Sequence, residues 1–196
     1  SYSGNSIEVL SCAHTAIMQK CIIIGITSGG KLLDLINNHS HFIYKINPDL
    51  YNPCKQPRMA IGFSFGSYLK ILQKLNILPL AADYSVNLIN TLKTLDIDSI
   101  EKEAKKYSKE MLNKYIQVVS GGYLAGNAEL LSKQLNWNSK QYGSFVLVSE
   151  AMHHLCEGIM HPSDKKDFLY LILSSSLLDS SDTKNLSIIM NYLRMN

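Results

Sequence analysis

The sequence lacks the features that would place it among membrane, secreted or nucleic-acid-binding proteins. Its longest apolar run, CIIIGI, is far too short to cross a bilayer, which takes about 20 residues. A basic n-region followed by an apolar stretch and a small-residue cleavage site is absent, so no signal peptide is predicted. The formal net charge is only +3, and no basic stripe is interleaved with aromatic residues. We therefore expect a cytoplasmic protein with neither a membrane nor a nucleic acid as partner.

Cysteine is also scarce, and its spacing carries no motif. The four cysteines form no CxxC pair and follow no regular interval; they are Cys12, Cys21, Cys54 and Cys156. Cys12 and Cys21 lie in helix-like and strand-like patterns, which predicts reduced, buried thiols. Free thiols fit a reducing, cytosolic compartment. No metal site and no cofactor is predicted.

What the chain does contain is an alternation of strand and helix patterns, which occurs twice. Helical spacing of apolar residues runs from Ser6 to about Lys20. The β-branched run CIIIGIT then predicts a parallel strand covered on both faces. After a glycine-rich turn, further helix and strand patterns follow in the order KLLDLINNH, HFIYKI and, beyond a proline loop, RMAIGFSFGSYLKILQKL.

A predicted helical segment separates the two stretches of alternating strands and helices. Ser85–Leu95 and Ser99–Tyr115 are predicted helices, and the segment EKEAKKYSKE in the second indicates a solvated face. The second stretch then reads IQVVSGG, AELLSKQLNW, SFVLVSE, AMHHLCEGIM, DFLYLIL and DTKNLSIIMNYL. We expect Asp182 or nearby serines to cap the last helix.

This order predicts two α/β units with parallel sheets. At 196 residues the chain is long enough for two small domains or one large one. The expected boundaries are 1–80 for the first domain, 81–115 for a helical linker and 116–196 for the second domain.

The opening segment SYSGNS combines three hydroxyl side chains with a glycine, directly before a predicted helix. A helix N-terminus carries unpaired N–H groups and a partial positive charge, which favour an anion. The glycine lets the backbone approach closely, and the hydroxyls can donate to phosphate oxygens. The alternative is an ordinary cap, with Ser6 as N-cap, Glu8 nearby and no ligand.

The same segment resembles the phosphate-binding loop of sugar isomerase (SIS) domains. Its tyrosine–serine–glycine–asparagine form is similar to the bifunctional phosphoglucose/phosphomannose isomerase family, which usually reads SYSGNT. PRMAIGFSFG at Pro57–Gly66 resembles the family's PR-A-x-GYSF segment, and SEAMHH at Ser149–His154 more weakly resembles PE-x-x-H-N-E. The resemblance implies two SIS-type three-layer αβα units. It also implies an earlier βαβ unit that is missing here, so we expect a partner or homodimer interface to cover the exposed strand.

The resemblance implies aldose–ketose interconversion of hexose 6-phosphates, without a cofactor. The phosphate-binding residues would be Ser1, Ser3, Gly4, Asn5 and Ser6. Arg58 would stabilise the enediolate; the alternative is a surface side chain. His153, three residues after Glu150, would open the sugar ring; the alternatives are a structural histidine or a role for His154.

One position departs from the family pattern. The family's general base is a glutamate in N-E-N-x-K, where this chain reads NWNSK with Trp137. An indole cannot abstract a proton from carbon, although Glu129, Glu150 or Glu157 could substitute. The glutamate of H-N-E is also absent, with Leu155 in its place. Three hypotheses remain: a phosphosugar isomerase with an altered base, a phosphosugar-binding sensor or regulator that has lost catalysis, and a structural remnant. Trp137 itself could be a packing residue, an interface residue or a platform for a sugar ring.

Overall fold

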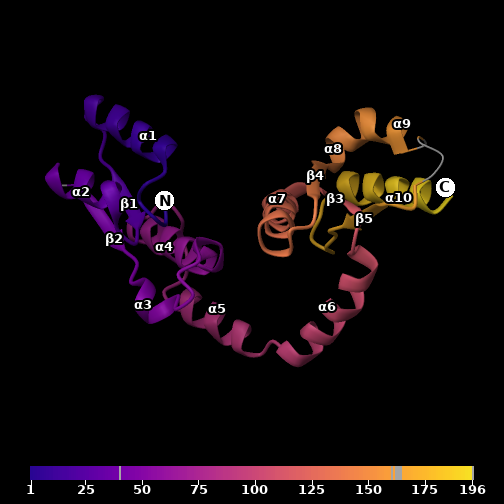
Figure 1. Ribbon diagram of the computed structural model, residues 1–196, viewed down its shortest axis with the longest axis horizontal. Helices are drawn as coiled ribbons and strands as arrows, with labels where there is room; N and C mark the ends of the chain where they lie inside the picture. Colours follow the sequence, from indigo (N-terminus) through magenta and orange to yellow (C-terminus); the bar gives the residue numbers. More distant parts are fainter. Residues whose placement is uncertain (40, 160, 162–164, 196) are drawn as a thin grey trace. The chain divides into compact units, whose positions relative to one another are not determined.

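The computed structural model divides into two compact units, Ser1–Thr94 and Leu95–Asn196, and each contains its own parallel sheet (Figure 1). Among the described residues, no helix combines the length and the apolar character that a bilayer crossing requires. The residues that the structure describes are 1–39, 41–159, 161 and 165–195.

The first unit has a two-stranded parallel sheet in which Ile24 pairs with Phe42 and Thr27 with Lys45. The predicted alternation of helix and strand is confirmed here. The elements are α1 (Ile7–Met18), β1 (Ile24–Thr27), α2 (Gly30–Asn38), β2 (Phe42–Lys45), α3 (Pro48–Tyr51), the 3₁₀ turn η1 (Pro57–Met59), α4 (Ile61–Lys74) and α5 (Tyr84–Lys93).

The two faces of this sheet differ in how well they are covered. On one face α1 and α2 pack a small core around Ala13, Leu32 and Ile36. The other face and α4 line an apolar groove of about 640 Å³, in which Ile22 is 79% and Phe42 is 65% exposed. The expectation that the β1 strand is covered on both faces is therefore wrong, because α4 shields the second face only in part.

The second unit has a three-stranded parallel sheet in the order β4-β3-β5. Its elements are α6 (Ile97–Met111), β3 (Tyr115–Ser120), the 3₁₀ turn η2 (Gly122–Leu124), α7 (Ala125–Gln134), the π-helical turn η3 (Leu135–Ser139), β4 (Gly143–Leu147), α8 (Val148–Glu150), the π-helical turn η4 (Ala151–Leu155), α9 (Cys156–Ile159), β5 (Phe168–Ile172) and α10 (Ser180–Met195).

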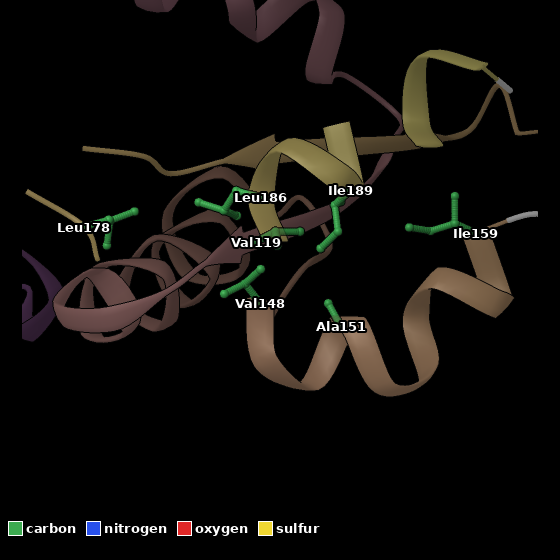
Figure 2. Packing of buried hydrophobic residues seen from close by; sticks show 7 residues of the cluster. All are labelled: Val119, Val148, Ala151, Ile159, Leu178, Leu186 and Ile189. Carbon is green, nitrogen blue, oxygen red and sulfur yellow. The ribbon is translucent and has the colours of Figure 1, made fainter. Parts of the chain in front are cut away.

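The central strand β3 is buried on both faces, as a parallel strand between helical layers should be. Ile116 and Val118 pack with α7 on one side of the sheet. Val119 points to the other side, where it meets Val148 and residues of α8, α9 and α10 (Figure 2). The second unit is thus a three-layer αβα sandwich, and the predicted α/β class with parallel sheets is confirmed.

Two local predictions need correction in the second unit. The helix predicted to reach Tyr115 ends at Met111, because Asn113 has a positive φ of 62° and Tyr115 already pairs with Phe168 in the sheet. The cap of α10 is Asp179, not Asp182 or a serine: Asp179 Oδ1 accepts the N–H of Asp182 at 2.7 Å. An N-cap side chain reaches the third residue of its helix in this way.

The predicted burial of two cysteines is also wrong. Cys12 and Cys21 are both exposed. In α1 only Ala13 is fully buried, since the helix presents one narrow side to α2, and Cys12 lies away from it. Cys21 lies between α1 and β1, outside both elements, where its side chain is exposed.

Candidate functional site

The opening loop, residues 1–6, is fastened to the carboxyl end of β1. The carbonyl oxygen of Tyr2 accepts three hydrogen bonds, from Ser28 N at 2.8 Å, Ser28 Oγ at 2.7 Å and Thr27 Oγ1 at 3.1 Å. The backbone nitrogen of Ser1 donates to Ile26 O at 3.2 Å. The carboxyl end of a parallel strand is where α/β proteins generally bind ligands.

The same loop also occupies the N-terminus of α2. Asn5 Oδ1 accepts the N–H of Lys31 at 3.1 Å, and Gly4 O accepts the N–H of Leu32 at 2.9 Å. Gly4 has φ of 69°, and a Cβ at this position would lie 1.8 Å from Gly29 O. Only glycine fits there. Because the loop itself satisfies these N–H groups, α2 does not offer them to a ligand.

The N-terminus of α1, in contrast, remains available. Ser6 is the N-cap by backbone geometry, but its side chain accepts no hydrogen bond from the helix. Its Oγ lies 3.0 Å from Ser1 Oγ instead, and the first bond closed within the helix joins Leu10 N to Ser6 O. Within the described part of the chain, the N–H groups of Ile7, Glu8 and Val9 have no acceptor. The ordinary serine cap, offered above as the alternative, is therefore not formed.

The predicted phosphate-binding residues thus gather in one loop of the first unit. Ser1 and Ser6 face each other through their hydroxyls, Ser3 Oγ accepts the N–H of Asn5 at 3.3 Å, and Gly4 sets the turn. Hydroxyl donors lie next to free helix N–H groups, an arrangement that suits a phosphate. The carboxylate of Glu8 in the first turn opposes an anion, but its side chain is exposed to water.

Arg58 lies in the same unit, on the 3₁₀ turn η1 that Pro57 begins. Its side chain is exposed. The loop leading to it contacts the opening loop through Asn52, whose Nδ2 donates to Tyr2 Oη at 2.8 Å. Sequence reasoning missed Asn52, because a single asparagine in a loop carries no signal of a contact 50 residues away.

The second unit holds the other two candidates, Glu150 and His153. Glu150 lies near His154, the residue after His153: His154 Nε2 is 3.9 Å from Glu150 Oε2. All three side chains are exposed on a segment that runs from the short helix α8 into a π-helical turn. The structure brings Glu150 to His154 and shows no comparable contact to His153 among the described residues.

Trp137 lies in the π-helical turn that follows α7 and is 44% exposed. The turn is tied to β4, because Asn136 Nδ2 donates to the carbonyl oxygens of Ser132 at 2.8 Å and Gly143 at 2.6 Å. Glu129, a possible substitute base on α7, makes an ion pair with Lys133 at 2.5 Å. Within the described residues, no group of three or more histidine, cysteine or acidic side chains could hold a metal ion.

Two curated proteins with similar sequences are bifunctional phosphoglucose/phosphomannose isomerases. The chain is 29% identical over 174 residues to a bifunctional phosphoglucose/phosphomannose isomerase of Aquifex aeolicus, covering 88% of this chain and 50% of that protein. It is also 29% identical over 201 residues to the protein of the same name from Caldicellulosiruptor bescii, covering 97% and 56%. The chain resembles these bifunctional isomerases. It spans about half the length of the curated relatives it matches. No family model matches the chain.

Solved structures share the fold at lower identity. A candidate phosphosugar isomerase from Salmonella typhimurium LT2 aligns with a TM-score of 0.65 and 18% identity, covering 98% of this chain and 57% of that one. A candidate phosphosugar isomerase from Clostridium difficile 630 aligns with a TM-score of 0.62 and 16% identity, covering 97% and 54%. The SIS-type fold that the opening motif implied is thereby supported along almost the whole chain.

Proposed function

We propose that this chain carries the phosphosugar-isomerase activity of its relatives, the interconversion of glucose or mannose 6-phosphate with fructose 6-phosphate. One observation carries the proposal: the serine hydroxyls of the opening loop gather beside the free N–H groups of α1. The curated relatives, named as isomerases of these sugars, support the same reading.

The opening loop would hold the 6-phosphate. Ser1, Ser3 and Ser6 donate hydroxyl hydrogens, and the first N–H groups of α1 supply the positive end of the helix dipole. The phosphate is remote from C1 and C2 of the sugar, so this binding energy fixes the position of the reacting carbons without taking part in the bond changes.

The reaction itself needs three further functions. An acid–base group moves a proton to the ring oxygen and removes one from the anomeric hydroxyl, which opens the ring; we assign this to His153 with Glu150. A base then takes the proton from C2 of the aldose, leaving a cis-enediolate whose negative oxygen Arg58 would stabilise. The hydroxyl proton moves from O2 to O1, and return of the carbon-bound proton to C1 gives the ketose, so the base is regenerated.

The second candidate function is a phosphosugar-binding sensor without turnover. Trp137 favours it, because no carboxylate stands at the position where the relatives' motif carries the general base. General base catalysis contributes about 10²–10⁴-fold, so a chain without a substitute would bind the sugar and convert it very slowly. A homodimer and a cytoplasmic location remain predictions for either function.

Two measurements on the same protein separate the candidates. The first is a coupled assay that follows glucose 6-phosphate formed from fructose 6-phosphate, and the second is the thermal shift that fructose 6-phosphate causes. Turnover supports the isomerase, and a shift without turnover supports the sensor. If neither effect is seen, the phosphosugar proposal is wrong.

Two variants test whether the opening loop is the phosphate site. We expect Ser3→Ala to abolish most of the thermal shift, because it removes one hydroxyl donor from the loop. Ser11→Ala is the matched control: Ser11 is an exposed serine of α1 outside the loop, and the shift should stay as in the unchanged chain. An equal shift in both variants would remove the loop as the phosphate site.

A further inference from the structure

Asn52 is a buried polar residue that joins two loops of the first unit. Only 3% of its surface is exposed, and both the nitrogen and the oxygen of its side-chain amide form hydrogen bonds. Its side-chain Nδ2 donates to Tyr2 Oη at 2.8 Å and to Gln56 O at 2.9 Å, and Oδ1 accepts from Cys54 Sγ at 3.0 Å. Its backbone N–H donates to Pro48 O at 2.8 Å. A side chain held by this many directed bonds cannot rotate or shift without breaking several of them.

On one side, Asn52 reaches the opening loop. Tyr2 is itself fixed, because its carbonyl oxygen accepts three hydrogen bonds from Thr27 and Ser28 at the end of β1. The Tyr2 side chain therefore extends from an anchored backbone to the amide of Asn52. Ser1 and Ser3, the neighbours of Tyr2, belong to the phosphate site proposed above.

On the other side, Asn52 reaches the residue from which η1 starts. Gln56 is the N-cap of that 3₁₀ turn, and its carbonyl oxygen accepts both from Asn52 Nδ2 and from Met59 N at 3.0 Å. Arg58 lies two residues further on, inside the turn. The backbone that carries Arg58 is thus held through Gln56 to the same amide group that holds Tyr2.

We propose that Asn52 is a positioning residue, which fixes Arg58 relative to the phosphate loop. The inference rests on the proposed function, since it takes the opening loop as the phosphate anchor and Arg58 as the cation for the enediolate. The two amide hydrogens have separate partners, since one holds the loop through Tyr2 and the other holds the arginine turn through Gln56. A displacement of about 1 Å between anchor and arginine is enough to cost roughly 10²-fold in transition-state stabilisation.

Two substitutions test this connection, and each removes one of the two hydrogen bonds that Asn52 Nδ2 makes. Asn52→Asp keeps the size of the side chain, and its carboxylate can still accept from the Tyr2 hydroxyl, but it faces Gln56 O with no hydrogen to donate. Tyr2→Phe leaves Asn52 and Gln56 joined and removes only the hydroxyl on the other side. Either change should let Arg58 move against the loop, whereas the serine hydroxyls and the N–H groups of α1 stay in place.

The experiment compares two ligands by isothermal titration of the 196-residue chain. Inorganic phosphate reports on the anchor alone. A five-carbon hydroxamate with a terminal phosphate reports on anchor and arginine together, because its planar anion has the charge distribution of the enediolate. We expect Asn52→Asp and Tyr2→Phe to lower the ratio of hydroxamate to phosphate affinity by about tenfold or more, with phosphate affinity within about twofold of the unchanged chain.

Asn47→Ala is the matched control. Asn47 is the N-cap of α3, at the opposite end of that helix from Asn52, and its Oδ1 accepts the N–H of Asp49 at 3.2 Å. The variant therefore also loses a local hydrogen bond, but not one of those that join Asn52 to Tyr2 and Gln56. Its affinity ratio should be unchanged. The unfolding temperature of each variant identifies one that fails to fold. If Asn52→Asp does not fold, Tyr2→Phe still tests whether Asn52 connects the phosphate loop to the turn of Arg58.

The possible results distinguish a failure of the positioning role of Asn52 from a failure of the proposed phosphosugar function. A ratio that is unchanged in both folded variants, or affinities for both ligands that fall together, would overturn the positioning role. If the unchanged chain binds phosphate but shows no preference for the hydroxamate, the positioning role of Asn52 is wrong, whereas phosphate binding by the opening loop is still supported. If it binds neither ligand, the proposed function itself is wrong.

Discussion

Gly4 lies so close to Gly29 that a Cβ on the first would stand 1.8 Å from the carbonyl oxygen of the second. The positive φ of Gly4, 69°, adds a conformational reason for glycine at this position. The contact presses the opening loop onto the glycine turn after β1. It places the serine hydroxyls at the N-terminus of α1 rather than of α2.

Replacement of Gly4 by alanine should therefore destabilise the first unit. The φ angle alone costs about 1–3 kcal/mol for a residue with a Cβ, and the clash with Gly29 O adds to that cost. Chemical denaturation measures the free energy of unfolding. Gly66→Ala is the control, since Gly66 is a helical residue of α4 with nothing within 4 Å of an added Cβ, and we expect it to stabilise by about 0.5–1 kcal/mol. A neutral Gly4→Ala would mean that the loop does not hold this conformation.

Trp137→Glu tests whether the missing carboxylate limits turnover. The side chain is 44% exposed, so a glutamate can replace it without burying a charge. We expect turnover of fructose 6-phosphate to rise by about tenfold or more, part of the 10²–10⁴-fold that a general base supplies. Trp137→Gln introduces a side chain of the same size as glutamate with no basic oxygen, and it should not show the gain. Equal rates in the two variants would place the base elsewhere in the chain.

The two neighbouring histidines can be separated by single substitutions. We expect His153→Ala to lower kcat by about 10²-fold, the size of a lost acid–base catalyst, because the isomerase motif assigns ring opening to this position. His154→Ala should change kcat little, since it removes only the contact of 3.9 Å to Glu150. Steady-state kinetics with fructose 6-phosphate measures both. The reverse order of effects would transfer the role to His154 and its partner Glu150.

Cys156 should react more slowly with iodoacetamide than the other cysteines. Burial, with a smaller contribution from the Glu157 carboxylate, raises the pKa of its thiol, so less of it is thiolate at about pH 8. Cys12 and Cys21 are exposed and should be alkylated first. Peptide mass spectrometry over a time course gives the rate for each cysteine. Full denaturant is the control, in which the rates should converge; a fast reaction of Cys156 in the folded protein would contradict its placement beside Met152.

Much of the fold was predictable from the sequence, because its signals are local. Helical spacing in α1 and the β-branched run at β1 depend on residues that are near neighbours in the chain. The same holds for the opening loop, where a glycine between serines precedes a helix. The helix end at Met111 was misplaced because Tyr115 joins the sheet through a partner, Phe168, that lies far along the chain.

The sequence by itself determined the alternation of strands and helices and the chemistry of the opening loop, since both are written in the order of neighbouring side chains. Only the tertiary structure decided which helix end stays open to an anion, because Asn5 satisfies an N–H group of α2 across 26 residues. It also decided that Glu150 meets His154, and that Asn52 joins Tyr2 to the turn of Arg58. Directed hydrogen bonds between distant residues depend on how the chain folds back on itself, and no local pattern encodes that geometry.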